Sequence, residues 1–289
     1  MSKNLQQNTS WGGVSGWYDE LLTKQEGTYQ KDLILPNLLR LLAPKPGETI
    51  LDLACGQGFF SREIEKTGAK VIGADIAKEL IAIAQRNSQE DVRRSSAQKA
   101  TKPVEFHVAP SDKLTFCPTA SVDKVIIILA LQNIENIAGT LEECNRVLKM
   151  NGRLIVVLNH PAFRIPKHSS WQWDAGDQGA AQKELMERGA KPRPHSGKQF
   201  RRIDAYMSEI RERIEMNPGE DRASNKKFTV SFHRPLQVYF KAFAKAGFAV
   251  SRLEEWVSHK RSVAGGRAEE ENRIRKEIPM FLFLEAVKK

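Results

Sequence analysis

The first part of the chain alternates short apolar runs with amphipathic segments. Apolar residues at helical spacing occupy residues 30–43, and the apolar runs at 49–54 and 70–74 are each followed by a helical pattern. Short apolar runs bounded by turn residues indicate buried strands, and apolar positions three and four residues apart indicate helices. Repeats of this strand–helix unit predict right-handed crossovers and a parallel sheet.

The alternation continues to residue 160. A third strand is predicted at 104–109, after a polar stretch at 87–103 that we interpret as an exposed extension or loop. The run at 124–131 has the apolar character of a central parallel strand that is buried on both faces. An amphipathic helix and a fifth strand at 153–159 follow.

The strand–helix pattern is interrupted after residue 160. Residues 161–231 are rich in Pro, Gly, Trp and charged side chains. Within them, the segments 210–216 and 228–232 alternate apolar and polar positions, which predicts a β-hairpin with one apolar face. A helix over 201–215 is the alternative.

The pattern returns near the C-terminus. A helical stripe at 236–243 precedes apolar runs at 248–257 and 279–287, which are separated by a charged segment at 258–278. A helix that leads into two final strands fits a sheet ending in an antiparallel hairpin. The chain is therefore predicted to be an α/β protein, with a doubly wound, seven-stranded, mostly parallel sheet, an antiparallel last strand and an inserted region.

Composition narrows the class of protein. The 289 residues are 40% hydrophobic, which is enough for one large domain with a core. No apolar run approaches the roughly 20 residues that span a bilayer, and the polar N-terminus lacks the pattern of a signal peptide. Three scattered cysteines indicate neither a disulfide framework nor a metal site, so we expect a cytoplasmic protein without a metal. The net charge of +10 would suit a nucleic-acid partner, although the basic residues are spread along the chain.

The most informative motif is ILDLACGQG at residues 50–58, a strand that runs into a glycine-rich turn before a helix. Such turns bind ligands at the carboxyl ends of parallel strands. The fingerprint of dinucleotide-binding folds requires a third glycine where this chain has Ser61, and Asp52 is an unexpected acid before the turn. Asp75 ends the second strand, where a carboxylate accepts hydrogen bonds from ribose hydroxyls or, alternatively, caps the helix that starts at Ala77.

The order of these motifs resembles one family. ILDLACGQGFFS and AKVIGADIAKELIAIA are similar to the first two motifs of class I S-adenosylmethionine-dependent methyltransferases, which have a Rossmann-like fold. VDKVIIILALQNIEN and VLKMNGRLIVVLNHP resemble their fourth and fifth strands. FHRPLQVYFKAFAKAGFAVSRLEEW resembles the late helix and sixth strand of the small-molecule, type 11 branch. The resemblance covers about residues 17–288 apart from the insertion.

The resemblance implies S-adenosyl-L-methionine as the cofactor and assigns a role to individual residues. The residues that would contact the methionine part are Asp52, Ala54, Cys55, Gly56 and Gly58 in the first turn, with Leu129 and Leu131 at the end of the fourth strand. The remaining contacts are Asp75 on the ribose, Ile76, Ser111 and Asp112 on the adenine, and Tyr18 and Tyr29 in a lid.

Two departures from the family pattern qualify these assignments. Ala54 replaces the commonest glycine, and Pro110 stands where many relatives have an acid, so that adenine recognition relies more on Asp112. The aromatic residues of the lid have a second interpretation, because they also suit a simple cover for the core.

The same resemblance suggests how the chain is divided. The predicted divisions are a disordered tail at 1–10, an N-terminal helical lid at 11–48, a cofactor-binding core at 49–160, an inserted cap on the substrate side at 161–231 and the end of the α/β core at 232–289.

The predicted activity is methyl transfer to an oxygen, nitrogen or carbon atom of a small molecule. Much of the catalysis is then the positioning of the acceptor, and a base is required only if the acceptor loses its proton early. His160 and His233 flank the insertion and are candidate bases, whereas each also suits a structural role beside a following proline. An RNA methyltransferase and a non-catalytic cofactor-binding partner protein are the alternatives.

Overall fold

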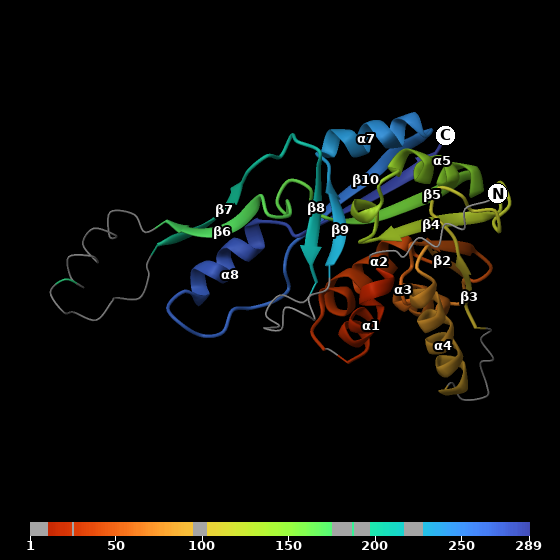
Figure 1. Cartoon of the computed structure of the whole chain (residues 1–289), viewed down its shortest axis with the longest axis horizontal. Coiled ribbons are helices and arrows are strands. Elements are labelled where there is room, and N and C mark those ends of the chain that lie inside the picture. The colour runs from red at the N-terminus through yellow and green to blue at the C-terminus, as the bar shows by residue number, and fades with distance from the viewer. Residues whose placement is uncertain (1–10, 25, 95–102, 175–186, 188–196, 217–227) are drawn as a thin grey trace, which may run out of the picture.

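A seven-stranded sheet runs through the centre of the structure in the order β10-β11-β5-β4-β1-β2-β3 (Figure 1). The computed structural model describes residues 11–24, 26–94, 103–174, 187, 197–216 and 228–289, so the tail predicted at 1–10 lies outside the described residues. The strands are β1 (Thr49–Leu53), β2 (Lys70–Asp75), β3 (Glu105–Val108), β4 (Val122–Ile128), β5 (Leu148–Asn159), β10 (Phe248–Trp256) and β11 (Phe281–Lys288).

The direction of the strands confirms the predicted sheet. β1 pairs in parallel with β2 and β4, whereas β11 lies between β5 and β10 and is antiparallel to both. The parallel strands therefore end together at one edge of the sheet, where open α/β folds bind their ligands. The fold is a doubly wound α/β fold with an antiparallel last strand.

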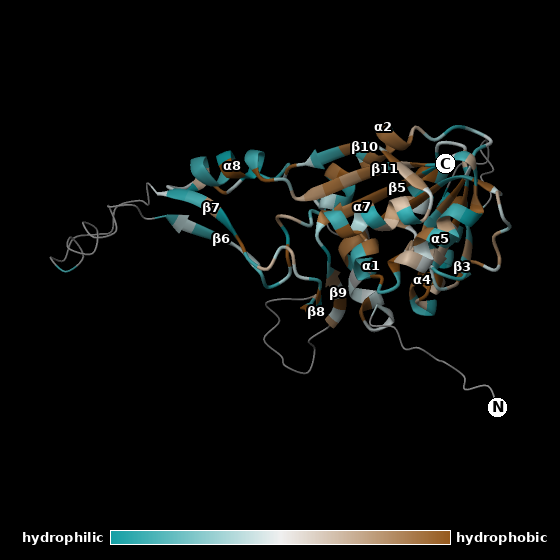
Figure 2. Cartoon of the chain, turned by 90° about the horizontal axis from the view of Figure 1, so that it is seen from above, coloured by the Kyte–Doolittle hydropathy of each residue, from teal (hydrophilic) through white to brown (hydrophobic). Residues whose placement is uncertain are grey.

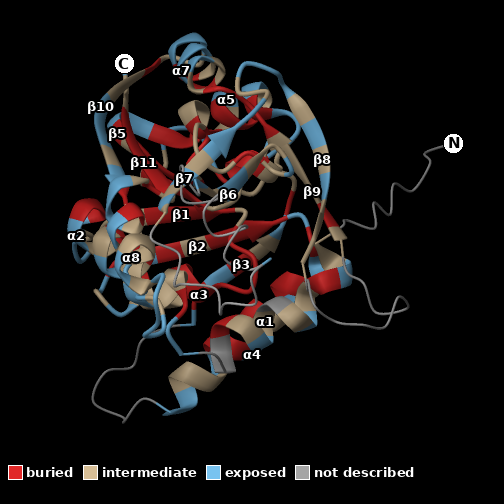
Figure 3. Ribbon diagram, turned by 90° about the vertical axis from the view of Figure 1, so that its left-hand side faces the viewer, coloured by how far each residue is buried: buried red, intermediate tan, exposed pale blue. Residues whose placement is uncertain are grey.

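Helices cover both faces of the sheet. On one face, α5 (Ile137–Val147) and α7 (Leu236–Lys245) pack on buried residues of the strands such as Leu51. On the other face, α1 (Ser15–Lys24), α2 (Leu35–Leu42), α3 (Phe59–Glu65) and α4 (Lys78–Arg94) pack on residues such as Ile50. Neighbouring residues of a strand point to opposite faces, so a strand with two covered faces must be apolar throughout. Figure 3 shows β1 and β2 as buried strands.

The insertion contains two separate hairpins. β8 (Ile210–Glu215) and β9 (Phe228–His233) pair antiparallel, which confirms the predicted hairpin and shows that a helix over 201–215 is wrong. β6 (Ser169–Asp174) and β7 (Lys198–Ile203) form a second hairpin that the sequence did not reveal. In Figure 2, this hydrophilic hairpin projects from the apolar sheet together with a helix of the C-terminal part.

The structure differs from the predicted pattern at two boundaries and adds a helix that the pattern did not indicate. The strand predicted at 124–131 ends at Ile128, because Leu129 has a left-handed φ of 55°. The polar stretch from residue 87 begins in α4, where Asn87 donates to Asp19 Oδ1 (3.1 Å) and so keeps a buried polar side chain satisfied. The charged segment 258–278 contains α8 (Ala268–Glu277), in which only Ile274 is buried.

Two kinds of feature are missing from the described part of the chain. None of its helices combines the length and the apolar composition needed to cross a membrane. It contains no cluster of three or more His, Cys, Asp or Glu side chains that could hold a metal ion. Its cysteines, Cys55, Cys117 and Cys144, are buried and form no disulfide.

The Phe106 ring provides a test of how tightly the sheet is packed. A Cβ at Gly73 would lie 2.4 Å from this ring, and one at Gly58 would lie 2.7 Å from it. We expect Gly73→Ala to lower the free energy of unfolding by about 1–3 kcal/mol, the usual effect of overpacking a core. Urea denaturation measures the change.

Gly16→Ala is the matched control, because a Cβ at that helical position meets no described atom within 4 Å. Its free energy of unfolding should stay the same or rise slightly, since alanine favours a helix. Equal urea-denaturation midpoints for the Gly73 variant and the parent protein would contradict the prediction, because they would show that the Phe106 ring moves aside without a cost in stability.

Candidate functional site

A small pocket lies at the carboxyl ends of β1, β2 and β4. Its volume is about 120 Å³. The wall is made by the turns that follow these strands and by the N-terminal segment, and its residues include Asp52, Ala54, Cys55, Gly56, Asp75, Ile76, Leu129, Ala130, Asn133 and Trp11. The structure thus brings together seven of the residues that the sequence predicted for the cofactor.

The turn after β1 is formed by three left-handed residues. Ala54, Gly56 and Gly58 have φ values of 58°, 58° and 77°. A left-handed conformation is open to glycine and strained for alanine, so Ala54 carries a strain that the surrounding fold must hold. The turn is closed by the Cys55 N–H, which donates to Ala74 O (3.0 Å).

Asp75 links the turns after β1 and β2. One carboxylate oxygen, Oδ2, accepts the Gly56 N–H (2.9 Å), and Oδ1 accepts the Ala77 N–H (2.8 Å). The side chain is buried, and this burial raises its pKa while the N–H groups of Ala77, Gly56 and Ile76 oppose the rise. The contact with Ala77 is the helix-capping interaction that the sequence suggested, and a carboxylate with about four lone-pair sites still has acceptor capacity for a ligand.

Asp52 is held by a residue that the sequence did not point to. Its Oδ2 accepts the Ser61 hydroxyl (2.5 Å), and only 2% of Asp52 is exposed. Burial raises the pKa of Asp52 to about 7, with the nearby charge of Asp75 adding to the rise and the Ser61 hydroxyl opposing it. Ser61 stands where the dinucleotide fingerprint requires glycine, and this departure was the available signal.

Several predicted cofactor residues lie away from this pocket. Ser111 hydrogen-bonds to Thr140, and Asp112 accepts from Asn136 Nδ2 (2.8 Å). Gly58 is absent from the wall, and Leu131 is fully buried in the core.

The two lid tyrosines give separate results. Tyr18 belongs to α1, and its side chain is outside the described part of the structure. The Tyr29 hydroxyl bonds to Ser258 Oγ (2.9 Å), and the ring packs edge-on to Phe281 at 5.6 Å. Tyr29 does not line the small pocket but lines the two larger cavities described next.

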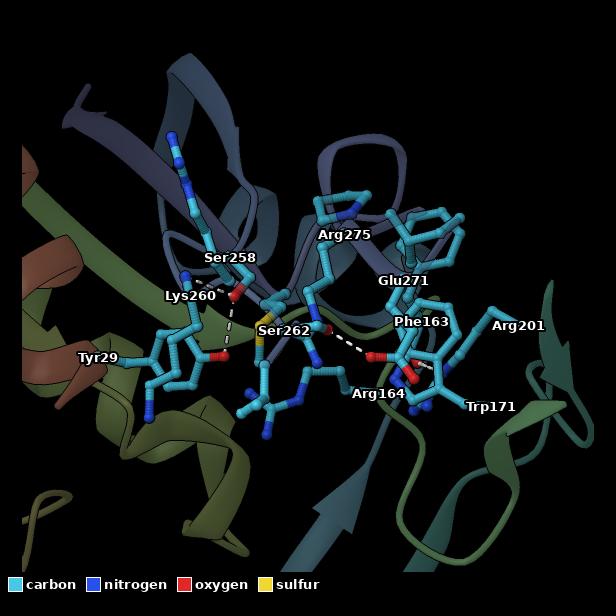
Figure 4. Close-up of a pocket in the computed structure, with 15 residues that line it drawn as sticks. Tyr29, Phe163, Arg164, Trp171, Arg201, Ser258, Lys260, Ser262, Glu271 and Arg275 are labelled. Carbon is cyan, nitrogen blue, oxygen red and sulfur yellow. Dashed lines mark hydrogen bonds between the residues drawn. The ribbon is translucent and has the colours of Figure 1, made fainter. Parts of the chain in front are cut away.

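A central cavity of about 670 Å³ adjoins the small pocket. The two spaces share Trp11, Leu129 and Asn133 in their walls. The rest of the central cavity is walled by α1, by the end of β5 and by the insertion, including β8 and β9. An outer cavity of about 670 Å³ lies beyond it and shares Tyr29, Arg164 and Arg201 with the central cavity (Figure 4).

The end of β4 supplies polar groups to the boundary between the small pocket and the central cavity. Asn133 donates to Leu129 O (3.3 Å). Gln132 also donates to Leu129 O (2.7 Å), which leaves its buried Oε1 without a donor among the described residues. A buried acceptor without a partner is costly, so a ligand that donates a hydrogen bond would be favoured there.

Neither candidate base lines the small pocket, the central cavity or the outer cavity, whereas His233 lines a further space of about 30 Å³ beside the central cavity. His160 Nδ1 accepts the Ala162 N–H (3.2 Å), and Nε2 donates to Glu255 Oε1 (2.8 Å). His233 Nε2 donates to Tyr206 O (2.9 Å). Burial lowers the pKa of both imidazoles, and their hydrogen bonds oppose the shift. Neither histidine lines the central cavity.

Comparisons with known proteins agree with this geometry. Residues 51–156 match the family described as methyltransferase domain. A demethylmenaquinone methyltransferase of Tropheryma whipplei is 32% identical over 42% of this chain and 46% of its own length. A 23S rRNA uracil methyltransferase of Acidithiobacillus ferrooxidans is 30% identical over 38% of this chain and 24% of its own length. The chain thus spans about half, or less, of the curated relatives described.

A similarity in structure covers much more of the chain. The crystal structure of an S-adenosylmethionine-dependent methyltransferase from Mesorhizobium loti matches 90% of this chain and 100% of its own length, with a TM-score of 0.63 and 23% identity. This similarity establishes the fold. Residues 51–156 therefore form a methyltransferase domain, within a chain that has the fold of the class I S-adenosylmethionine-dependent methyltransferases.

Proposed function

We propose that this protein binds S-adenosyl-L-methionine at the small pocket and directs its methyl group to a small molecule in the central cavity. The observation that carries the proposal is the common wall of the two spaces. Leu129 and Asn133 face both of them, so a donor on one side and an acceptor on the other meet at the end of β4. Ligands of open α/β folds bind at this edge of the sheet.

The residues of the small pocket suit the cofactor. Asp75 would accept the ribose hydroxyls through its remaining lone pairs, and Ile76, of which 41% is exposed, would pack against the adenine. Asp52 and the turn at Gly56 would hold the methionine part. The pocket of 120 Å³ takes only part of such a ligand, so the rest lies over the exposed side of Ile76. The cofactor supplies a methyl group that is already activated by its bond to a sulfonium sulfur.

The two buried acids give an electrostatic reason for binding a cation. Both carboxyl groups have raised pKa values because burial removes water from their charged forms. A positively charged ligand beside them restores the stabilisation that water would supply. The pocket therefore favours a cationic ligand over a neutral one of the same shape.

The size of the central cavity supports a small molecule as the acceptor. A volume of about 670 Å³ falls within the usual range for sites of drug-sized ligands, about 300–1,000 Å³. Reactivity is then governed mainly by how the chain positions the acceptor, and Gln132 Oε1 would orient a donating hydroxyl or amine. The predicted roles of His160 and His233 as bases gain no support from their positions.

RNA methylation is the second candidate, because the net charge of +10 favours a polyanion. Incubation of the protein with cell extract and cofactor labelled in the methyl group distinguishes the candidates. We expect the label to appear in a small molecule that passes an ultrafiltration membrane and that chromatography separates from the unreacted cofactor, since the cofactor passes the same membrane.

Label in RNA would support the second candidate instead, and nuclease treatment of the retained fraction identifies that outcome. A protein that binds the cofactor and labels nothing would be a non-catalytic partner. Cofactor incubated without the protein is the control.

Removal of the Asp75 carboxylate tests the cofactor site. We expect Asp75→Ala to weaken binding of S-adenosyl-L-methionine by about tenfold or more, because hydrogen bonds to a charged group contribute roughly 1.5–3 kcal/mol. Isothermal titration calorimetry measures the dissociation constant. Circular dichroism verifies that the variant, which also loses the bonds to Gly56 and Ala77, keeps its fold.

Glu79→Gln is the matched control, since Glu79 lies in the first turn of α4, close to Asp75 in the sequence, but outside the wall of the small pocket. Unchanged affinity in a folded Asp75 variant would remove the basis of the assignment.

The raised pKa of Asp52 predicts a pH dependence of stability in the cofactor-free protein. The folded state holds the proton up to about pH 7, whereas an unfolded carboxyl loses it near pH 4. The stabilisation is therefore complete below about pH 4 and is lost as the pH rises through 7. Asp52→Asn mimics the protonated form and should be more stable than the parent protein at pH 8, by an amount on the order of a few kcal/mol.

Urea denaturation of both proteins at pH 5 and pH 8 measures this difference. Asp123→Asn is the contrasting control, because hydrogen bonds to Lys149 and to the Thr49 N–H lower the pKa of Asp123 in spite of its partial burial. Its carboxylate stabilises the fold at high pH, and that stabilisation is lost as the pH falls. Equal stabilities of the Asp52 variant and the parent protein at pH 8 would contradict the prediction that the ionised, buried Asp52 carboxylate destabilises the folded state.

A further inference from the structure

Two arginine side chains separate the central cavity from the outer cavity. Arg164 follows the turn after β5, and Arg201 lies on β7. Each of these two arginines lines the central cavity and the outer cavity. In Figure 4, Arg164 lies between Tyr29 and Trp171, and Arg201 lies beside Trp171. Two segments far apart in the sequence therefore present positive charge to the same space.

Neither guanidinium forms an ion pair with a carboxylate of the described residues. Arg164 donates through Nη1 to Asn159 Oδ1 (2.6 Å) and stacks on the Phe281 ring at 5.3 Å. Arg201 donates through Nε to Phe163 O (2.8 Å) and through Nη2 to Ser169 Oγ (2.7 Å). All these acceptors are neutral. Burial lowers the pKa of Arg164, and the positive charge of Arg201 adds to this effect.

Three other partly buried arginines have acidic partners, whereas the buried Arg234 donates to the Glu135 carbonyl oxygen. Arg62 pairs with Asp91, Arg146 with Glu143 and Arg153 with Glu285, at 2.6, 2.7 and 3.2 Å. Placing two like charges together without an acid disfavours the fold, and an anion between them would remove that penalty. Arg164 Nε and Nη2 and Arg201 Nη1 keep N–H groups that no described residue accepts.

The outer cavity adds to the positive field. Its charged wall residues are Arg164, Arg201, Lys260, Arg261, Arg275 and a single acid, Glu271. Glu271 accepts the Ser262 hydroxyl. Cavities lined by one sign of charge concentrate ligands of the opposite sign. Aromatic rings of Trp171 and Phe281 beside the two guanidiniums provide apolar surface for the rest of such a ligand.

We propose that the methyl acceptor is a small molecule with an anionic group, a carboxylate or a phosphate, and that Arg164 and Arg201 bind this group together. This inference rests on the proposed function, because it names the substrate class of the central cavity. The anionic group binds at the end of the cavity formed by the two arginines. The atom to be methylated then lies at the opposite end, near Leu129 and Asn133, beside the cofactor. Guanidinium groups bind both carboxylate and phosphate through paired hydrogen bonds.

Calorimetric titration of the full chain, saturated with S-adenosylhomocysteine, tests the inference. The probes are 1-naphthoate, 1-naphthyl phosphate and the neutral 1-naphthamide. We expect at least one anion to bind about tenfold more tightly than the amide, as charge-assisted hydrogen bonds imply. The stronger of the two anions identifies the preferred group.

Variants separate a binding role from a structural one. Arg201→Gln should abolish the preference for the anion, and Arg201→Lys should restore part of it, because lysine keeps the charge without the planar fork. Arg202→Gln is the matched control. Arg202 follows Arg201 on β7, so its side chain points to the other face of the hairpin and lies outside both cavities. Arg164→Gln repeats the test from the other side, with cofactor affinity as the measure of intact folding.

The outcomes distinguish this inference from the proposed function. Equal affinity for acid and amide, no measurable binding of either acid, or a preference that survives in Arg201→Gln would overturn the inference. Methyl label in a neutral product that passes through an anion-exchange column would also overturn it while leaving the proposed function intact. Arginine-dependent binding of the acid, in a protein that labels nothing, would support the anion site and reject the methyl transfer.

Discussion

The arrangement of the site depends on one buried carboxylate. Asp75 joins the turns after β1 and β2 by accepting the N–H groups of Gly56 and Ala77. If this acceptor were lost, two backbone donors would remain unpaired away from water, at a cost of about 1–3 kcal/mol each. The same bonds hold a turn that contains three left-handed residues, one of them the strained Ala54. The ligand edge of the sheet is thus ordered before a ligand arrives, which lowers the entropy that binding must overcome.

Packing beneath this edge imposes a second constraint. The Phe106 ring occupies the space that side chains at Gly58 and Gly73 would fill. The glycine in the turn therefore serves the core as well as the backbone, since its φ of 77° and its missing Cβ are both required. Because the turn and the strand beside it contact the same ring, a shift in the core would move the pocket.

Local features were predictable from the sequence, and long-range features were not. Features that depend on neighbours in the chain can be predicted from the pattern of residues. These are the strands, the glycine-rich turn and the positions of Asp52 and Asp75. The extent of α8 does not follow from periodicity, because only Ile274 of that helix is buried. The contacts of Tyr29 with Ser258 and of Ser111 with Thr140 join distant segments, so tyrosine and serine alone gave no indication of these partners. Arg164 and Arg201 meet only after the insertion folds, and single arginines in a basic chain are not distinctive.

This contrast explains why the proposed donor and acceptor halves of the site differ in how well they can be inferred. The donor half is made by consecutive turns of the sheet, whereas the acceptor half is assembled from α1, the end of β5 and two hairpins of the insertion.

The location of the positive charge separates the two candidate classes of acceptor. Charge that binds a polyanion lies on exposed faces and pairs with many phosphates. Here two cations are partly buried, stack on aromatic rings and line two cavities, an arrangement that suits the proposed single anionic group of a small ligand. The location of these two charges, more than the net charge of +10, favours a small acceptor over RNA.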